Sequence, residues 1–92
     1  MKSIICKVEQ FEGENGPVRN QFRIFTSDGV YFQSYSSIIA FRPFSGKVKL
    51  DTDKWDYSKT TGKYRNQFLN ETKKETEAKI KSGEYELVNL NN

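Results

Sequence analysis

The hydrophobic pattern changes its period once, between residues 55 and 64, and this change limits the fold more than any other feature. Before it, apolar residues alternate with a period of two, as in strands. After it, most recur every three or four positions, as in helices. Ser58 is a suitable helix N-cap, and we expect the rings of Trp55 and Tyr57 to seat the helix against the sheet. The sequence therefore predicts a single α+β domain spanning residues 1–92.

Four strands are predicted in the first part of the chain. They cover residues 2–8 and 21–26, a third strand after Gly29, and residues 47–51, in which Val48 and Leu50 face inward and Lys47, Lys49 and Asp51 face outward. Residues 12–17 are predicted to form a loop, and the apolar run 38–41 is expected to extend or bend the third strand through a bulge. The predicted sheet is an antiparallel β-meander of about four strands.

The segment from Ser27 to Val30 predicts a hairpin, because Asp-Gly at its centre favours a two-residue type I′ turn. That turn would place Thr26 opposite Tyr31 and Phe25 opposite Phe32. One face of the hairpin would then carry Phe22, Ile24, Tyr31 and Tyr35, and the other Arg23, Phe25, Val30 and Phe32. A hairpin that is apolar on both faces is either covered on both or uses one of them for binding.

The C-terminal part predicts a helix, or a kinked pair of helices, packed on one face of the sheet. The expected contacts are Tyr64, Phe68, Leu69 and Ile80, whereas Lys59, Lys63 and Arg65 are expected to face solvent. Residues 72–75 match a capping box, so the first helix should end near Asn70 and a second begin at Thr72, unless the chain only kinks there. Gly83 should follow the helical segment, and residues 85–88 are compatible with a last short strand.

The composition excludes several classes of chemistry. The chain has no histidine and a single cysteine, Cys6, so it lacks the ligands of common zinc sites, the usual base of nucleophilic enzymes and an internal disulfide. Asp51, Asp53 and Asp56 lie close together but lack the spacing of a calcium loop. The apolar runs at residues 3–6 and 38–41 are too short to span a bilayer. We therefore expect a cytoplasmic, non-enzymatic protein without metal, cofactor or membrane contact.

The positive charge is concentrated in two segments, although the net charge is only +3. Residues 19–49 and residues 59–81 each carry a net charge of +4, and the first of them also contains the aromatic hairpin. Aromatic rings that stack on bases, with cations that contact phosphates, are typical of single-stranded nucleic-acid sites. The candidate nucleic-acid-binding residues are Arg23, Phe25, Phe32, Tyr35, Arg42, Lys47, Lys49, Lys59, Lys63 and Arg65.

Plainer interpretations exist for both candidate features. The hairpin aromatics would also fill a core covered on both sides, which a small aromatic-rich chain needs. The helix start at residues 58–63 offers free N–H groups, hydroxyls and two lysines to an anion, but it lacks the leading Gly of a Walker A loop, and Tyr64 stands where Ser or Thr is required. An ordinary N-cap explains that segment better.

Several stretches of the chain resemble a family of small uncharacterised phage proteins. They are residues 31–35, 38–40 and 55–58, with Thr60, Thr61, Tyr64, Phe68 and Leu69. Residues 9–22 and 79–85 resemble the branch carried by phages of gut Bacteroidetes, including the crAss-like group. The resemblance implies a protein made inside an infected bacterium, and it transfers no catalytic or binding residue.

Two functions remain open from the sequence. The first is non-enzymatic binding of nucleic acid, with single strands favoured, through an aromatic and basic face of the sheet. The alternative is a protein–protein interaction module, either an inhibitor of a host system or a homodimer that hides the second apolar face. The possible partners are therefore nucleic acid, a host protein or a second copy of the chain.

Overall fold

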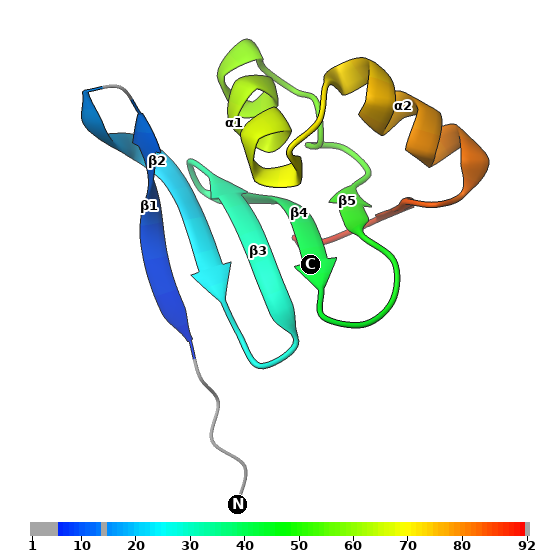
Figure 1. The fold of residues 1–92 in the computed structure, drawn as a ribbon, viewed down its shortest axis with the longest axis horizontal. Coiled ribbons are helices and arrows are strands. Elements are labelled where there is room, and N and C mark those ends of the chain that lie inside the picture. Colours follow the sequence, from blue (N-terminus) through cyan, green and yellow to red (C-terminus); the bar gives the residue numbers. More distant parts are fainter. Residues whose placement is uncertain (1–5, 14, 92) are drawn as a thin grey trace, which may run out of the picture.

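The computed structural model describes residues 6–13 and 15–91, which form one sheet of six strands and two helices (Figure 1). The strands lie across the sheet in the order of the sequence, and neighbours are antiparallel except β5 and β6, which are parallel. The elements are β1 (Lys7–Gly13), β2 (Gly16–Phe25), β3 (Gly29–Ser34), β4 (Ser37–Pro43), β5 (Lys49–Asp51), α1 (Lys59–Leu69), α2 (Lys73–Ser82) and β6 (Glu86–Val88).

The α+β class is confirmed, but the prediction of about four strands is wrong: the run 38–41 forms a strand of its own, and residues 86–88, which were compatible with a last short strand, form β6. Residues 2–5 of the predicted first strand lie outside the described residues. The predicted loop 12–17 is instead a hairpin in which Gly13 pairs with Gly16, and Gly16 has a φ of 105° that glycine adopts without strain. β1 and β2 therefore extend well into a segment that was expected to be irregular.

The apolar run 38–41 belongs to a separate strand, β4, rather than to an extension of β3. The chain reverses after Ser34, which pairs with Ser37 across the turn. Tyr35 takes a left-handed conformation with a φ of 57°, and its N–H donates to the carbonyl of Asn20 at 2.7 Å. The sixth strand, β6, pairs in parallel with β5, which an antiparallel meander did not anticipate.

The β2–β3 hairpin turns through the three residues between Phe25 and Gly29, in place of the predicted two-residue Asp-Gly turn. Phe25 pairs with Val30, so the register differs from the prediction by two residues. The Thr26 hydroxyl donates to the Gly29 carbonyl at 3.0 Å and accepts from the Asp28 N–H at 3.2 Å, which closes the loop one residue earlier on each side. A shift of two residues leaves the strand side chains on their predicted faces, whereas Tyr35 lies beyond the end of β3 in a turn.

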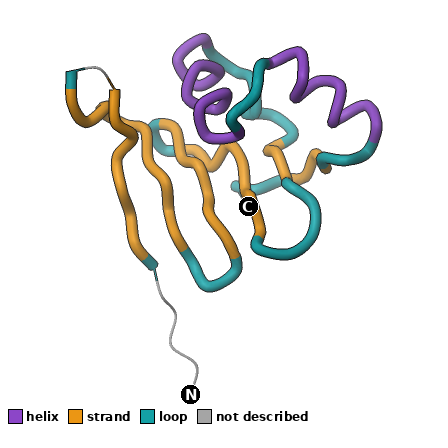
Figure 2. Tube along the Cα trace, in the orientation of Figure 1, coloured by secondary structure: helices purple, strands orange, loops and turns teal. Residues whose placement is uncertain are grey.

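The core lies between one face of the sheet and the two helices, which are on the same side of the sheet (Figure 2). Phe11 and Phe32 of the sheet are fully buried, and the Phe32 ring stacks on Phe68 of α1 at 5.7 Å between centroids. The predicted helix contacts are confirmed, since Phe68 and Leu69 are buried in this cluster and Tyr64 and Ile80 pack against it.

Both helices begin and end where local sequence signals placed them. The Ser58 hydroxyl accepts from the Thr61 N–H at the start of α1, and Asn70 closes that helix in a left-handed conformation. Thr72 and Glu75 form the predicted capping box, and Gly83 ends α2. The chain therefore forms two helices rather than one. Trp55 packs against the core as expected, whereas Tyr57 is exposed and does not seat the helix.

The opposite side of the sheet carries no helix, and we call it the open face. Cross-strand pairing places Val8, Ile24, Tyr31, Phe41 and Lys49 in one row on it. A second row holds Gln10, Phe22, Gln33 and Ile38. The predicted strand 47–51 is shortened to β5, Lys49–Asp51. Leu50 faces the core and Lys49 the open face as predicted, and Val48, just before the strand, also packs against the core.

The prediction that Asp51 faces outward is wrong, because the residue is 3% exposed. One carboxylate oxygen of Asp51 accepts from the N–H groups of Asp53 and Lys54, and the other accepts from the Leu90 N–H at 2.7 Å. The next residue, Asn91, uses its side-chain amide to donate to the Ile38 carbonyl and to accept from the Ile38 N–H. The C-terminal residues are thus fastened to β4 and β5.

Candidate nucleic-acid interface

Four of the predicted binding residues lie on the helix-covered face of the sheet. They are Arg23, Phe25, Phe32 and Arg42. Phe32 has no exposed surface, so stacking on its ring would require the helices to leave the sheet, and Phe25 packs against the same core. The guanidinium of Arg23 lies 4.2 Å from the centre of the Phe11 ring. Phe25 and Phe32 are therefore part of the core between sheet and helices, and Arg23 packs on a ring of the neighbouring strand.

Arg42 shows how a cation on this face is used. Its guanidinium lies 4.8 Å from the centre of the Phe68 ring, and its Nη1 donates to the Phe68 carbonyl at 3.0 Å. Because that carbonyl belongs to the last turn of α1, the contact satisfies a group that the helix itself leaves without a partner. Arg42 therefore caps α1, although its side chain stays partly open to solvent.

Arg65, which was expected to face solvent, is 1% exposed. Its Nη1 donates to the Trp55 carbonyl and to Asp56 Oδ1, both at 2.9 Å, and its Nη2 donates to Asn66 Oδ1 at 2.8 Å. The guanidinium also lies 5.1 Å from the centre of the Trp55 ring. Arg65 is thus a structural cation that holds the junction segment against α1, and a phosphate cannot reach it in this arrangement.

Asp56 is the counter-charge of this junction. Burial alone would raise the pKa of Asp56, but hydrogen bonds from Lys73 and Arg65 outweigh that effect and lower it. Lys73 Nζ lies 2.7 Å from Asp56 Oδ2, so this carboxylate connects α2 to the start of α1. The Asp56 carboxylate is therefore held by two cations, one from each helix.

Lys59 and Lys63 are exposed one helical turn apart on α1, and Tyr35 is exposed in the turn between β3 and β4. Lys59 borders a hollow of about 390 Å³ at the start of α1, where Asp56 and Lys73 also lie. Lys63 borders a different hollow, and Tyr35 borders neither of the two.

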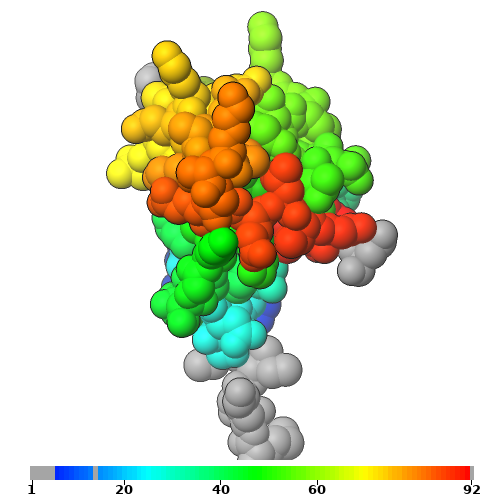
Figure 3. Space-filling view, turned by 90° about the vertical axis from the view of Figure 1, so that its right-hand side faces the viewer, coloured from blue at the N-terminus to red at the C-terminus, as the bar shows by residue number. Residues whose placement is uncertain are grey.

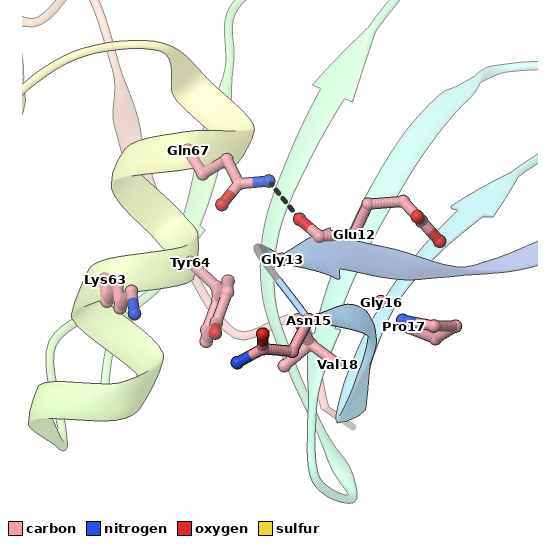
Figure 4. Close-up of a pocket in the computed structure, with 9 residues that line it drawn as sticks. All are labelled: Glu12, Gly13, Asn15, Gly16, Pro17, Val18, Lys63, Tyr64 and Gln67. Atoms are coloured by element: carbon pink, nitrogen blue, oxygen red, sulfur yellow. Dashed lines mark hydrogen bonds between the residues drawn. The ribbon is translucent and has the colours of Figure 1, made fainter.

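Lys63 belongs to a larger hollow between α1 and the β1–β2 hairpin (Figure 4). The hollow measures about 730 Å³, and Gln67 Nε2 donates to the Glu12 carbonyl across it at 3.5 Å. Its other lining residues are Gly13, Asn15, Gly16, Pro17, Val18 and Tyr64. Lys63 and Glu12 contribute opposite charges, so the described lining offers no positive field to a phosphate backbone.

Lys47 and Lys49 are the two predicted residues that share a hollow with an exposed aromatic ring, that of Phe44. They border a groove of about 490 Å³ at the end of the open face, which we call the end groove. Its other lining residues are Ser27, Asp28, Tyr31, Phe41, Pro43, Phe44, Ser45 and Gly46. The Phe44 N–H donates to the Asp28 carbonyl at 3.0 Å, which ties the β4–β5 loop to the β2–β3 turn. Figure 3 shows both segments beneath the helices.

Three aromatic rings shape the end groove. The rings of Tyr31 and Phe41 stack with their centroids 4.3 Å apart and their planes at 26°. Phe44 is 71% exposed, the highest exposure among the large hydrophobic side chains of the described residues. A flat ring held on a short loop, next to a preformed aromatic stack, presents π-faces to which a base can add.

The two lysines of the end groove differ in their surroundings. Lys49 Nζ lies 2.8 Å from Glu86 Oε1, and its hydrogen bond lowers the pKa of that glutamate. Lys49 is therefore partly neutralised, whereas Lys47 is exposed on the loop. We expect Lys47 to make the stronger contribution to the positive potential of the groove.

Tyr31, Phe41 and Phe44 were not among the predicted binding residues. Their assignment required knowing which face of the sheet the helices cover, and that depends on packing between distant segments. A local signal existed for Phe44 alone, because it follows Pro43 in a turn closed by Gly46, and an aromatic residue in such a turn is commonly exposed.

A second cluster of ionisable groups holds α2 against the segment before β6. The side chain of Glu71 is only 4% exposed and accepts from Lys79 Nζ at 2.7 Å, Thr76 Oγ1 at 2.6 Å and the Tyr85 hydroxyl at 2.9 Å. Burial alone would raise the pKa of Glu71, but these hydrogen bonds outweigh it and lower the pKa. Burial and the bond to Glu71 raise the pKa of Tyr85.

The lowered pKa of Glu71 predicts a loss of stability in acid. Because the folded-state pKa is below the unfolded value of 4.5, the contribution of Glu71 is complete above that value and is lost as the pH falls through the folded-state pKa. The free energy of unfolding, measured with urea at several values from about pH 7 to pH 3, should fall less steeply for Glu71→Gln than for the unmodified chain.

Glu84→Gln is the matched control for this measurement, since Glu84 is exposed and lies in the same part of the chain. This variant should follow the unmodified protein. Equal pH dependence of Glu71→Gln and the unmodified protein would show that the Glu71 carboxylate does not stabilise the fold.

The chain belongs to a family of unknown function, DUF8033, whose model matches residues 2–85. Nothing matched the chain in the comparisons with curated proteins and with solved structures. Neither helix among the described residues has the length and apolar character needed to cross a membrane. Within residues 6–13 and 15–91, no three Cys, Asp or Glu side chains are grouped so that they could hold a metal ion.

Proposed function

We propose that this protein binds single-stranded nucleic acid at the end groove, without enzymatic activity. The observation that supports the proposal is the exposed Phe44 ring beside the stacked Tyr31–Phe41 pair, with Lys47 and Lys49 at the same groove. Stacking on exposed rings needs bases that are not paired in a duplex, and lysines next to the rings can neutralise the phosphates between those bases.

The proposal includes the setting in which the protein acts. The resemblance of residues 31–35 and 55–58 to small phage proteins supports a role in the cytoplasm of an infected bacterium. Single-stranded nucleic acid is a common intermediate wherever genomes are copied or transcribed. A small binder of modest positive charge is suited to such a ligand, because its affinity depends on stacking as well as on charge.

The part of the open face formed by β1 and β2 supports an alternative function. Val8 is 56% exposed, and Phe22 and Ile24 are half-buried next to it. Among the described residues, strand pairing places no lysine or arginine beside these three on this face. A protein partner, such as a host protein inhibited by this chain, would fit that part of the face better than a nucleic acid. The two proposals therefore concern different ends of one surface.

Fluorescence anisotropy with a labelled single-stranded oligonucleotide tests the nucleic-acid proposal. Phe44→Ala should weaken binding by about 1–3 kcal/mol, because one stacking ring is lost. Lys47→Ala should lower the slope of log affinity against log salt by about 0.7, because one phosphate contact is lost. A duplex of the same sequence should bind more weakly than the single strand.

Lys81→Ala and Tyr35→Ala are the controls, because each removes an exposed side chain of the same type away from the end groove. Lys81→Ala should change the affinity less than Lys47→Ala, and Tyr35→Ala should change it less than Phe44→Ala. Absence of binding at low salt would contradict the proposal, as would an affinity that Phe44→Ala leaves unchanged. Binding of a protein partner by the unmodified protein, without binding of the oligonucleotide, would favour the alternative function.

A further inference from the structure

The outer edge of β1 is available for pairing with another strand. In the described residues, β1 pairs with β2 on one side and lies at the edge of the sheet. Its register is regular from Lys7, which pairs with Phe25, to Gln10, which pairs with Phe22, and it shifts between Gln10 and Glu12. The regular part of an edge strand presents free backbone groups to a neighbour, whereas a bulge ends such pairing.

The side chains of this edge alternate between charge and an exposed apolar group. Val8 lies on the open face and is 56% exposed. Lys7 and Glu9 lie on the other face, where Lys7 Nζ is 3.1 Å from Glu9 Oε2. On this edge a basic residue and an acidic residue flank an apolar one. When a second copy of the edge lies antiparallel to it, the basic residue of each copy can face the acidic residue of the other.

Symmetry restricts how two such edges can pair. Two antiparallel copies related by a two-fold axis place one residue opposite its own copy. With Lys7 or Glu9 on the axis, like charges face each other. With Gln10 on the axis, the pairing runs into the bulge. With Val8 on the axis, Val8 meets Val8, and Lys7 of each copy faces Glu9 of the other, which is the favourable arrangement.

We propose that a second copy of this chain pairs with β1, edge to edge and antiparallel, with Val8 on the two-fold axis. The row Phe41, Tyr31, Ile24 and Val8 then continues without interruption into the same row of the second copy. This explains why an apolar side chain is left exposed at the end of that row. The inference does not rest on the proposed function, because the end grooves lie away from β1 and stay open.

Charge reversal at the two flanking residues tests the pairing by sedimentation or by light scattering coupled to size exclusion. The unmodified protein should show a concentration-dependent mass that rises to twice that of one chain. Lys7→Glu alone and Glu9→Lys alone should each remain monomeric, because like charges then oppose each other twice at the interface. An equimolar mixture of the two variants should recover the doubled mass, since every opposed pair is again of unlike charge.

Lys81→Glu and Glu84→Lys give the matched control, because they change the net charge equally at exposed positions of α2 and the segment after it. Each control variant should dimerise like the unmodified protein. A monomeric unmodified protein at the concentrations used for NMR would overturn the proposal. So would a dimer that survives both β1 variants, or a mixture of these variants that stays monomeric.

Discussion

Replacing Arg65 with alanine is expected to lower the free energy of unfolding by about 3–5 kcal/mol. The variant removes three hydrogen bonds and leaves the Trp55 carbonyl and one Asp56 oxygen without their cation. It also leaves a cavity where a 1% exposed side chain was packed. Since domains of this size have a total stability of about 5–15 kcal/mol, a large share of the variant should be unfolded under mild denaturing conditions.

Urea unfolding followed by the fluorescence of Trp55 provides the measurement, because this single tryptophan lies beside the Arg65 guanidinium. Arg65→Met should lose less than Arg65→Ala, as it keeps part of the stem that packs in the core. Lys63→Ala is the control on the same helix, and its effect should stay within about 0.5 kcal/mol. Equal stabilities of the alanine variants at positions 63 and 65 would contradict the structural role of Arg65.

The second large effect is expected for Phe32→Ala, at about 3–5 kcal/mol of unfolding free energy. The Phe32 ring is fully buried between Phe11, at 5.2 Å, and Phe68, at 5.7 Å between centroids. Its loss creates a cavity at the centre of the contact between sheet and helices. Phe44→Ala, on the exposed loop, should change stability by no more than about 0.5 kcal/mol.

The two phenylalanine variants together separate folding from binding. Phe32→Leu, which refills part of the cavity, should recover much of the lost stability and bind oligonucleotide as the unmodified protein does. Phe44→Ala should remain folded and bind poorly. The opposite outcome, a stable Phe32→Ala variant with impaired binding, would mean that the helix-covered face carries the ligand and that the end groove does not.

Local signals in the sequence were sufficient to predict the helices. Ser58, Thr72 and Gly83 act through hydrogen bonds or backbone conformations within a few residues, so their effect does not depend on the rest of the fold. The strands were harder because two turns are tighter than their composition indicated. Gly16, which pairs with Gly13, and Tyr35, which precedes β4, each have a positive φ where the chain reverses.

The candidate site was only partly predictable, for a physical reason. Alternation assigned the residues of β2 and β3 to the correct faces, even though the register was shifted by two, but it failed for Tyr35, which lies in a turn. Which face the helices cover is decided by packing between segments far apart in the sequence, and this separated Phe32 from Tyr31. Charge was equally ambiguous, because Arg65 and Lys47 look alike in sequence although one is buried and the other exposed.

The parallel pairing of β5 with β6 has a consequence for how the chain acquires its structure. Both helices lie between these two strands in the sequence, so β6 is synthesised only after α1 and α2. Until β6 emerges, the edge of β5 lacks the strand partner that includes Val88. The Asp51 carboxylate likewise lacks the hydrogen bond that the Leu90 N–H later donates. We therefore expect closure of the sheet to be a late event during synthesis, with an open strand edge exposed to other chains in the meantime.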